Sequence, residues 1–389
     1  MMQKQMYEWK RSGNGEKSRV NKAKQAAESF IGRDDMFAGI MAYGQGIIHD
    51  TYLVRLQNTA EGFILQRINT RVFANPEAIM HNLQLLCDHI RERMEKNGSR
   101  IETDWQMLQP IAARDGSYFF VDAEGTFWRA LSFIREALPL ERILSLDDAR
   151  EAGRALGIFH SLTRDMDPGL LHQTLPGFHN IEKYLEHYDQ TAAGVEAAGE
   201  YGVFCQQFIA DRRSWAPVLE KARRQKRLRV RIIHGDPKIN NIMVDRITRR
   251  AVSMIDLDTV MPGLVHYDIG DCLRSCCNTI GEESSDFSAV RFDLNRCEAL
   301  LGGYTAAAHG CLTGLDFDFL FDAIRLIPFE LGLRFYTDFL EGNVYFRAGH
   351  PDQNLERAVL QFRLVQSIEE QEKRLRTIIK EYRSVFAES

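Results

Sequence analysis

Residues 231–258 hold the most informative pattern of the chain: RIIHGDPKINNIMV at 231–244 and AVSMIDLD at 251–258, separated by a polar hairpin at 245–250. Both segments contain short apolar runs that are typical of buried β-strands. Strands joined by a tight turn run antiparallel, so Asn241 at the start of one and Asp256 at the end of the other are expected side by side. Asp236 lies in the loop before Asn241.

These polar residues match what phosphoryl transfer requires. The reaction needs a carboxylate that accepts the proton of the attacking hydroxyl, and oxygen ligands for the magnesium ion that bridges the nucleotide phosphates. Asp236 suits the first role, and Asn241 and Asp256 suit the second. Lys238 is placed to meet the charge of the phosphoryl group in transfer. Asp258 is either a ligand of a second metal ion or a cap of the next turn.

The alternative is that these Asp and Asn side chains only bond to the backbone of turns. The joint spacing of His234, Asp236, Asn241 and Asp256 between apolar strands favours the phosphotransfer site. His234 itself is expected to be a structural hydrogen-bonding residue. Asp268 and Asp271, further along, are expected to cap a helix and brace the loop.

At these residues the sequence resembles the aminoglycoside phosphotransferase and protein-kinase-like superfamily, whose catalytic loop H-G-D-x-x-x-x-N stands here at 234–241. The later metal-binding aspartate of the superfamily matches Asp256. Within it, IDLDTVMPG at 255–263 and YDIGD at 267–271 look most like the bacterial N-acetylhexosamine 1-kinases. The resemblance implies an α+β, two-lobed protein-kinase-like fold with a small antiparallel β-rich N-lobe and a larger, mainly helical C-lobe. It also implies ATP and Mg²⁺ as cofactors.

The pattern along the chain agrees with two lobes. Residues 26–135 are expected to form the nucleotide-binding N-lobe, with a helix that begins after an N-cap at Asn75 and strands at 41–43, 50–56, 63–68 and in a hairpin over 116–133. Residues 136–389 are expected to form the C-lobe, which carries the catalytic loop and the acceptor site, with helices at 146–162, 180–191, 204–227 and from 292 onward. Residues 1–25 are rich in Lys and Arg and are expected to form a mobile basic tail.

Nucleotide contacts are assigned to three places. Gly44 and Gly46 precede the second strand, where glycine lets the backbone approach phosphates; without a third glycine, the pair is also typical of a plain hairpin turn. Kinase-like folds place a lysine on the third strand, but this chain has none there. Arg67 is the candidate replacement, and strand alternation places it on the face opposite its neighbour Gln66. Phe133 and Ile134, near the expected junction of the lobes, complete the set.

By resemblance to the sugar kinases, Arg334 and Tyr345 of the C-lobe are expected to contact the acceptor. The alternative for Arg334 is a surface ion pair with Asp338, one helical turn away. The hexosamine kinases carry a sugar-binding histidine directly after the second loop glycine, where this chain has Ile47. His49 is assigned to the acceptor instead, and this departure leaves the identity of the acceptor open.

Composition excludes several other classes. The 54 acidic residues against 49 Lys and Arg give a formal charge of −5, which offers no general attraction to nucleic acid or to an anionic membrane. The chain has neither an apolar run long enough to span a membrane nor the apolar core of a signal peptide at its start, so a cytoplasmic location is expected. The irregular spacing of the seven cysteines predicts reduced thiols and no zinc site.

Together these patterns predict an ATP- and magnesium-dependent kinase whose partners are a nucleotide and a small sugar acceptor. The resemblance points to the anomeric hydroxyl of an N-acetylhexosamine. Two alternatives stay open: a kinase of another small alcohol, such as an aminoglycoside or a choline-like molecule, and a catalytically inactive kinase fold that only binds a nucleotide.

Overall fold

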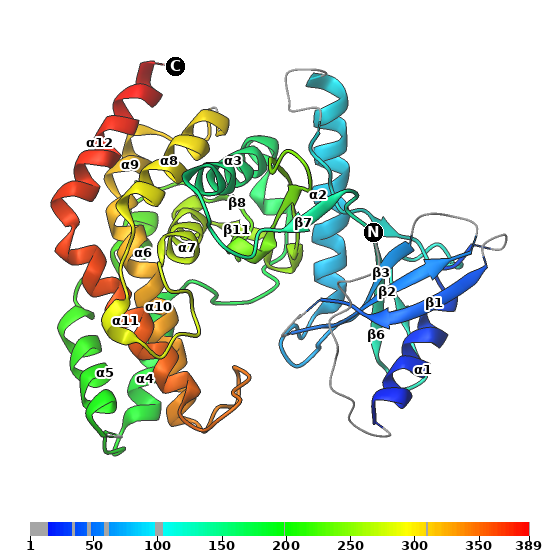
Figure 1. Cartoon of the computed structure of the whole chain (residues 1–389), viewed down its shortest axis with the longest axis horizontal. Coiled ribbons are helices and arrows are strands. Elements are labelled where there is room, and N and C mark those ends of the chain that lie inside the picture. The colour runs from blue at the N-terminus through cyan, green and yellow to red at the C-terminus, as the bar shows by residue number, and fades with distance from the viewer. Residues whose placement is uncertain are drawn as a thin grey trace. The chain divides into compact units, whose positions relative to one another are not determined.

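The computed structural model describes residues 15–32, 36–44, 48–57, 62–97, 104–197, 199–308 and 310–388. The chain divides into two compact units, one built on a β-sheet and the other mainly helical (Figure 1). The first unit takes in the described residues up to 80 together with 108–133. The second takes in those of 81–107 together with 134 onward.

The first unit contains one antiparallel sheet with strand order β1-β2-β3-β6-β4, and β5 also pairs with β6. Its strands are β1 (Phe37–Ala42), β2 (Asp50–Leu56), β3 (Gly62–Arg67), β4 (Pro110–Ile111), β5 (Phe120–Val121) and β6 (Phe127–Ser132). Alternate side chains point to one face, where Tyr52, Leu65 and Trp128 are part of a buried core. The strands predicted at 50–56 and 63–68 and the later hairpin are confirmed, whereas the first strand begins at Phe37, four residues before the predicted start at 41.

A helix, α1 (Gly15–Glu28), packs against this core. The expected mobile tail is therefore wrong for residues 15–25, while residues 1–14 lie outside the described residues. Ala23, Ala26 and Ala27 recur on one helical face and are at most 1% exposed. Lys22 lies on the exposed face and pairs with Glu124 at 2.6 Å. The sequence pattern did not indicate this helix, because basic residues outnumber the few alanines that form its apolar face. Alanine is nevertheless a strong helix former.

The helix predicted after Asn75 is confirmed as α2 (Pro76–Asn97), and the Asn75 side chain accepts a hydrogen bond from the Ala78 nitrogen at 3.1 Å. The predicted boundary of the N-lobe differs from the structure, because residues 81–107 group with the second unit. Asn82 of α2 explains this: its side chain donates to the carbonyls of His172 and Val260 at 2.8 and 3.0 Å.

The second unit is mainly helical, as predicted. Its helices include α3 (Leu146–Thr163), α4 (Ile181–Ala192), α7 (Val265–Cys277), α8 (Leu294–Ala307), α9 (Gly314–Asp318), α10 (Leu320–Leu340), α11 (Gln353–Glu370) and α12 (Glu372–Glu388). The single helix expected over 204–227 is instead two helices, α5 (Gly199–Arg212) and α6 (Val218–Arg224). Pro217 separates them, since proline has no backbone N–H with which to continue a helix.

Short strands support the loop that carries the motif. β8 (Arg231–Ile233) pairs with β11 (Met261–Gly263), and β9 (Ile242–Asp245) lies between β10 (Ala251–Met254) and β7 (Ala137–Pro139). All these pairs are antiparallel. The antiparallel pair β9–β10 confirms the hairpin predicted from residues 241–256.

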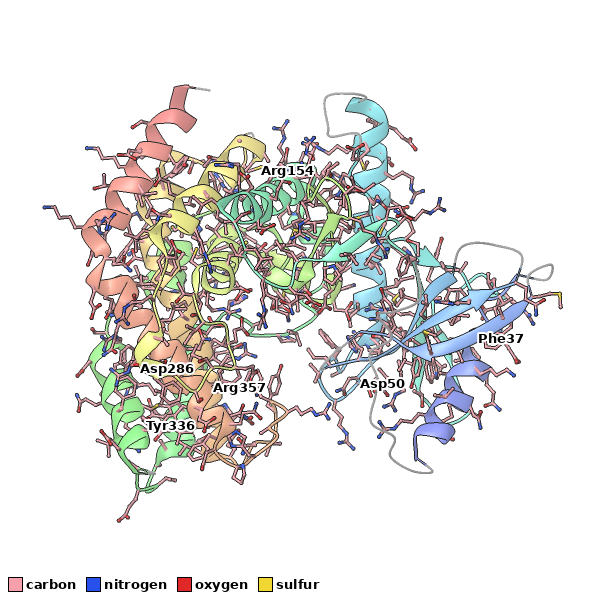
Figure 2. The ribbon with its side chains drawn as sticks, viewed as in Figure 1. Phe37, Asp50, Arg154, Asp286, Tyr336 and Arg357 are labelled. Atoms are coloured by element: carbon pink, nitrogen blue, oxygen red, sulfur yellow. The ribbon has the colours of Figure 1, made fainter. Side chains whose placement is uncertain are left out.

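Around these strands, α10 and α11 supply much of the core of the second unit. Tyr336 (Figure 2) and Phe362 are fully buried there. All seven cysteines are buried, and none takes part in a disulfide. Within the described ranges, no helix is long and apolar enough to cross a membrane.

Candidate active site

A buried carboxylate from α7 fixes the backbone of the loop at 234–241. Asp268 accepts hydrogen bonds from the backbone nitrogens of His234 and Gly235 at 2.7 and 2.8 Å. Nε2 of His160 on α3 donates to the same carboxylate at 2.9 Å. Burial opposes the charge of Asp268, but the hydrogen bonds from His160 and from the loop hold its pKa below the usual value. The expected bracing by Asp268 is confirmed.

His234 has the structural role that the sequence predicts. Its ring is fully buried; Nε2 donates to the Ile255 carbonyl at 3.0 Å, and Nδ1 accepts from the Asp236 nitrogen at 3.3 Å. Gly235 follows with a φ of +85°, and a Cβ there would lie 2.6 Å from the carbonyl oxygen of Thr259. Only glycine fits this left-handed position beside Thr259.

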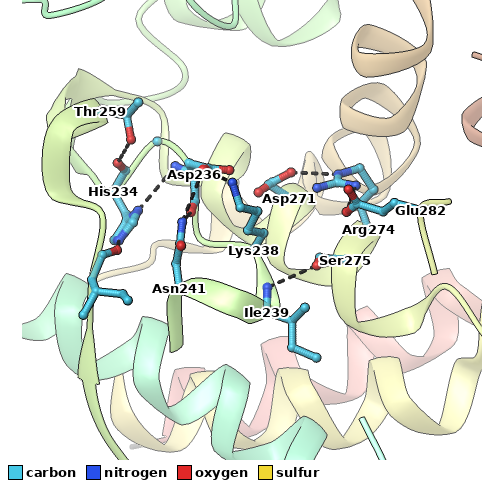
Figure 3. A network of polar contacts seen from close by, with 12 residues as sticks. His234, Asp236, Lys238, Ile239, Asn241, Thr259, Asp271, Arg274, Ser275 and Glu282 are labelled. Atoms are coloured by element: carbon cyan, nitrogen blue, oxygen red, sulfur yellow. Dashed lines mark hydrogen bonds and ion pairs between the residues drawn. The ribbon is translucent and has the colours of Figure 1, made fainter. Parts of the chain in front are cut away.

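Asp236, Lys238 and Asn241 lie together at the end of this loop (Figure 3). Oδ2 of Asp236 accepts from Nζ of Lys238 at 2.5 Å and from Nδ2 of Asn241 at 3.2 Å. The same Asn241 nitrogen donates to the Asp236 backbone carbonyl at 2.8 Å. The Asp236 side chain is 27% exposed, so it is both oriented by the protein and open to a proton-donating hydroxyl.

Asn241 and Asp256 flank the β9–β10 pair, where the Ile255 nitrogen donates to the Asn241 carbonyl at 2.9 Å. Because Asp236 occupies the amide nitrogen of Asn241, the amide oxygen is left for a cation. Asp256 is exposed and has a φ of +63°, which turns the chain directly after β10. An amide oxygen and a carboxylate are suitable ligands for Mg²⁺. Phosphate oxygens of the nucleotide and water molecules would complete its coordination shell. Asp258 is 2% exposed, and its role as ligand or cap stays a prediction.

Lys238 remains a cation in this setting. Burial opposes its charge, but the carboxylates of Asp236 and Asp256 raise its pKa above the usual value. Its side chain is about one-third exposed, at 35%. A lysine held in this way can stabilise negative charge without giving up its own proton.

Asp271 of α7 has a different role from the one expected. In Figure 3 its carboxylate and that of Asp236 lie on either side of the Lys238 ammonium. Its Oδ1 accepts from Nε of Arg274 at 2.8 Å, and Arg274 also donates to Glu282 at 2.6 Å. Burial, with the nearby charge of Asp236, raises the pKa of Asp271. Asp271 therefore anchors Arg274. Within the described residues, Asp268 contacts the backbone of the loop and Asp271 does not.

Arg334 on α10 lies among four aromatic rings. Its guanidinium carbon is 5.3, 5.1, 5.7 and 5.2 Å from the ring centroids of Phe178, Tyr184, Tyr345 and Phe346. Burial opposes the charge of Arg334, whereas Tyr184, Tyr345 and Glu330, and to a smaller extent Asp236, raise its pKa. The guanidinium is thus held by ring faces and lies within electrostatic range of the loop carboxylate.

Asp338, one turn further along α10, is buried at 3% exposure, so it is not the surface ion-pair partner of Arg334 that was the alternative. Its carboxylate accepts from the backbone nitrogens of Tyr345 and Phe346 at 2.6 and 2.9 Å. Nδ2 of Asn354 on α11 donates to it at 2.9 Å. Asp338 therefore shapes the segment at 341–352, which we term the α10–α11 loop, and so places the two rings beside Arg334.

All but one of the described residues assigned to the nucleotide belong to the first unit, and Ile134 belongs to the second. Gly44 has a φ of +72°, as its turn requires, and Gly46 lies outside the described residues. Arg67 is at the exposed end of β3 and donates through Nε to Asp50 at 2.8 Å. The Phe133 ring packs edge-on against Tyr43, with centroids 6.0 Å apart, and Ile134 is buried at the start of the second unit. Nucleotide contacts by these residues stay predictions.

His49 braces the same unit. It is 7% exposed, its Nδ1 accepts from the Asn69 nitrogen at 3.1 Å, and its ring lies 5.5 Å from that of Phe73. These contacts tie the start of β2 to the segment after β3. A contact between His49 and an acceptor stays a prediction.

Arg129 of β6 is a buried cation to which the sequence assigned no role. Gln66 and Arg67 do point to opposite faces of β3, and Oε1 of Gln66 accepts from Nε and Nη2 of Arg129 at 2.9 and 2.7 Å. Arg129 is 2% exposed. The available signal was a basic residue in the middle of the apolar strand at 127–132, where an arginine needs a partner.

The chain is similar to known phosphotransferases in sequence and in fold. The model of a family described as the phosphotransferase enzyme family, APH, matches residues 39–309. A microcompartment-associated aminopropanol kinase is 17% identical with a TM-score of 0.60 over 92% of this chain and 98% of its own. An aminoglycoside phosphotransferase from Alicyclobacillus acidocaldarius is 14% identical, with a TM-score of 0.60 over 90% and 96%. A choline kinase from Cryptosporidium parvum is 12% identical, with a TM-score of 0.56 over 94% and 99%. These structures share the fold of this chain.

Proposed function

Because the chain belongs to the phosphotransferase enzyme family, we propose that it is an ATP- and Mg²⁺-dependent kinase that phosphorylates a sugar, at the anomeric hydroxyl of an N-acetylhexosamine. The family supplies the reaction type, and Asp236, Lys238 and Asn241 stand together as that reaction requires. The acceptor rests on two further arguments: the resemblance of 255–271 to the N-acetylhexosamine 1-kinases, and the surroundings of Arg334.

Arg334 is the observation that carries the choice of acceptor class. Its positive charge interacts with Glu330 and, more weakly, with Asp236, beside which the reacting hydroxyl is expected to bind. A fixed cation there repels an acceptor that carries an ammonium group, such as choline, an amino alcohol or an aminoglycoside. Hydroxyl and carbonyl oxygens of a neutral sugar instead accept hydrogen bonds from the guanidinium. The ring of Tyr345, which is 50% exposed, offers a face for the sugar ring.

The loop residues then divide the chemical work. Asp236 accepts the hydroxyl proton while the sugar oxygen forms its bond to the γ-phosphorus of ATP and the bond from that phosphorus to ADP breaks. Lys238 balances the negative charge of the phosphoryl group during transfer. An anomeric hydroxyl is more acidic than an ordinary alcohol, which makes proton transfer to a carboxylate easier.

Asn241 and Asp256 hold the magnesium ion in this proposal. Bound there, Mg²⁺ neutralises charge on the nucleotide phosphates. Asn241 also donates to Asp236, so the residue that offers an oxygen to the metal orients the base as well.

The test is turnover of ATP with Mg²⁺ across N-acetylhexosamines, simple hexoses, aminoglycosides, amino alcohols and choline, with products identified by phosphorus NMR. We expect selective formation of an anomeric phosphate on an N-acetylhexosamine. Arg334→Gln is expected to lower kcat/KM for the sugar by about 10- to 100-fold while nucleotide affinity stays unchanged.

Three other results would each overturn a different part of the proposal. Turnover of choline or an aminoglycoside alone would keep the reaction and reject the acceptor. Faster turnover of cationic alcohols by wild-type protein than by Arg334→Gln would reject the electrostatic argument. Nucleotide binding without turnover of any acceptor would favour an inactive kinase fold.

A further inference from the structure

A buried ion pair lies beside the loop, outside the residues assigned to the reaction. Nδ1 of His179 and Oε1 of Glu330 are 3.0 Å apart, and their side chains are 5% and 3% exposed. His179 directly precedes Asn180, the N-cap of α4, and Glu330 lies in the middle of α10. The other ring nitrogen, Nε2, is 3.2 Å from the carbonyl oxygen of Gly235.

The partners of His179 determine which protons its ring carries. A backbone carbonyl only accepts hydrogen bonds, and so does an ionised carboxylate. Opposite an ionised Glu330, both ring nitrogens carry a proton, and the ring is an imidazolium paired with a carboxylate. Burial opposes this charge, but Glu330 raises the pKa of His179 above its usual value. Oε2 of Glu330 is buried with no hydrogen-bond partner among the described residues, so His179 supplies the one hydrogen bond seen there to this carboxylate, and the charge of Arg334 on the same helix also acts on it.

The surroundings of His179 hold the ring in one orientation. The rings of His179 and Tyr267 are stacked, with centroids 4.8 Å apart and planes 18° apart. Its backbone has a φ of +57°, a conformation that a residue other than glycine keeps only when its neighbours enforce it. Beyond Glu330 on α10, the acidic group that acts on His179 is Asp271 on α7. The ring is thus fixed by α7 and α10 together.

The carbonyl that His179 contacts belongs to the peptide bond between Gly235 and Asp236. The nitrogen of that peptide donates to Nδ1 of His234, at 3.3 Å. His179 therefore holds the oxygen of this peptide and His234 holds its nitrogen. Rotation of the peptide would turn the Asp236 carboxylate, so a contact on each side limits that rotation.

We infer that His179 and Glu330 are positioning residues that orient the Gly235–Asp236 peptide, and with it the catalytic carboxylate, for phosphoryl transfer. This inference rests on the proposed phosphotransferase activity but on no particular acceptor. Neither residue touches the reacting atoms. Loss of the pair is expected to lower kcat and to leave KM for both substrates nearly unchanged, because misalignment of a catalytic group costs rate more than binding.

The decisive comparison is between His179→Leu and His179→Gln. Leucine removes the N–H that reaches the Gly235 carbonyl, whereas the glutamine amide can still donate to it. We expect kcat to fall by about 10- to 100-fold in His179→Leu and to recover within a few-fold of wild type in His179→Gln. His187→Leu is the matched control, because His187 of α4 and Glu341, the C-cap of α10, form a similar pair at 2.7 Å that is exposed. Wild-type kcat in His179→Leu would overturn the inference.

A second measurement does not depend on any acceptor. Selective ¹⁵N labelling of histidine, with the His179 signal assigned by its loss in His179→Gln, reports how many ring nitrogens are protonated. We expect two protons on the His179 ring at neutral pH in the wild type, and one in Glu330→Gln. A single proton in the wild type would overturn the ion pair even if His179→Leu failed to fold. Failure of the proposed function is distinct, because it would appear as wild-type protein that phosphorylates no acceptor.

Discussion

Asn241 links two tasks of the site through one amide. Its nitrogen donates to the carbonyl and the carboxylate of Asp236, and this fixes the direction of its oxygen. A cation on that oxygen would hold the amide, and the amide would hold the base. Metal binding and orientation of the base are therefore expected to be coupled through Asn241.

We predict that Asp236→Asn lowers kcat by at least about 1,000-fold while affinity for the magnesium–nucleotide complex changes less than about threefold. The amide cannot accept the hydroxyl proton, but it has the size of the carboxylate and can still bond to Lys238 or Asn241. Steady-state kinetics and calorimetric titration of nucleotide with Mg²⁺ measure the two effects. Asp256→Ala is the matched comparison, since it is expected to remove the Mg²⁺-dependent part of nucleotide affinity. Turnover near wild type in Asp236→Asn would reject its role as base.

The residues of this site could be predicted where they are close in sequence. His234, Asp236, Asn241 and Asp256 lie on one loop and one hairpin, so spacing alone indicated that they meet. His179 and Glu330 are 151 residues apart, and no periodicity connects them. Their contact depends on how α10 packs, which the sequence pattern does not reveal.

Among the elements, α10 combines several functions on successive turns. Glu330 holds His179, Arg334 lies among four rings, and Asp338 binds the backbone of the α10–α11 loop. Sequence analysis predicted a helix here and singled out Arg334 from the resemblance. It could not show that Asp338 points inward, because an i, i+4 pair of opposite charges is equally typical of an exposed helix face.

We predict that Asp338→Asn raises KM for the acceptor by about tenfold and leaves KM for ATP and kcat within about threefold of wild type. The carboxylate accepts from two backbone nitrogens and from Asn354, and an asparagine amide cannot replace all three acceptor contacts. The α10–α11 loop should then hold Tyr345 less firmly beside Arg334. Steady-state kinetics with each substrate varied in turn provides the measurement.

The control for this element is Asp352→Asn, an exposed aspartate in the same loop, which is expected to behave as wild type. An equal rise of KM for ATP in Asp338→Asn would instead indicate general damage to the second unit. An unchanged KM for the acceptor would remove the α10–α11 loop from acceptor recognition.

At the scale of the whole chain, the fold class and the family were predicted correctly. The family match over 39–309 confirms the resemblance to the phosphotransferase family that was drawn from the loop at 234–241. The limits of the two units were not predicted correctly, because α2 begins in one unit and Asn82 holds its later residues in the other. A helix continues across such a boundary without any change in its periodicity, so the pattern carries no mark of it. α1 was missed because its composition is that of a basic tail.

The position of α1 outside the family match leads to a prediction about the stability of the first unit. Ala27 of α1 is fully buried, in the same apolar cluster as Tyr52 and Leu65 of the sheet. Ala27→Glu would place a larger, charged side chain there with no partner, and we expect it to lower the free energy of unfolding by about 2 to 4 kcal/mol. Because the two units have separate cores, hydrogen exchange should accelerate in β2, β3 and β6 while α10 and α11 stay protected.

The control is Gln25→Glu, on the exposed face of the same helix, which adds the same charge without burial and should leave exchange unchanged. Equal acceleration in both units would mean that the chain unfolds as one cooperative body, and no acceleration in the sheet would mean that α1 contributes little to the core it covers.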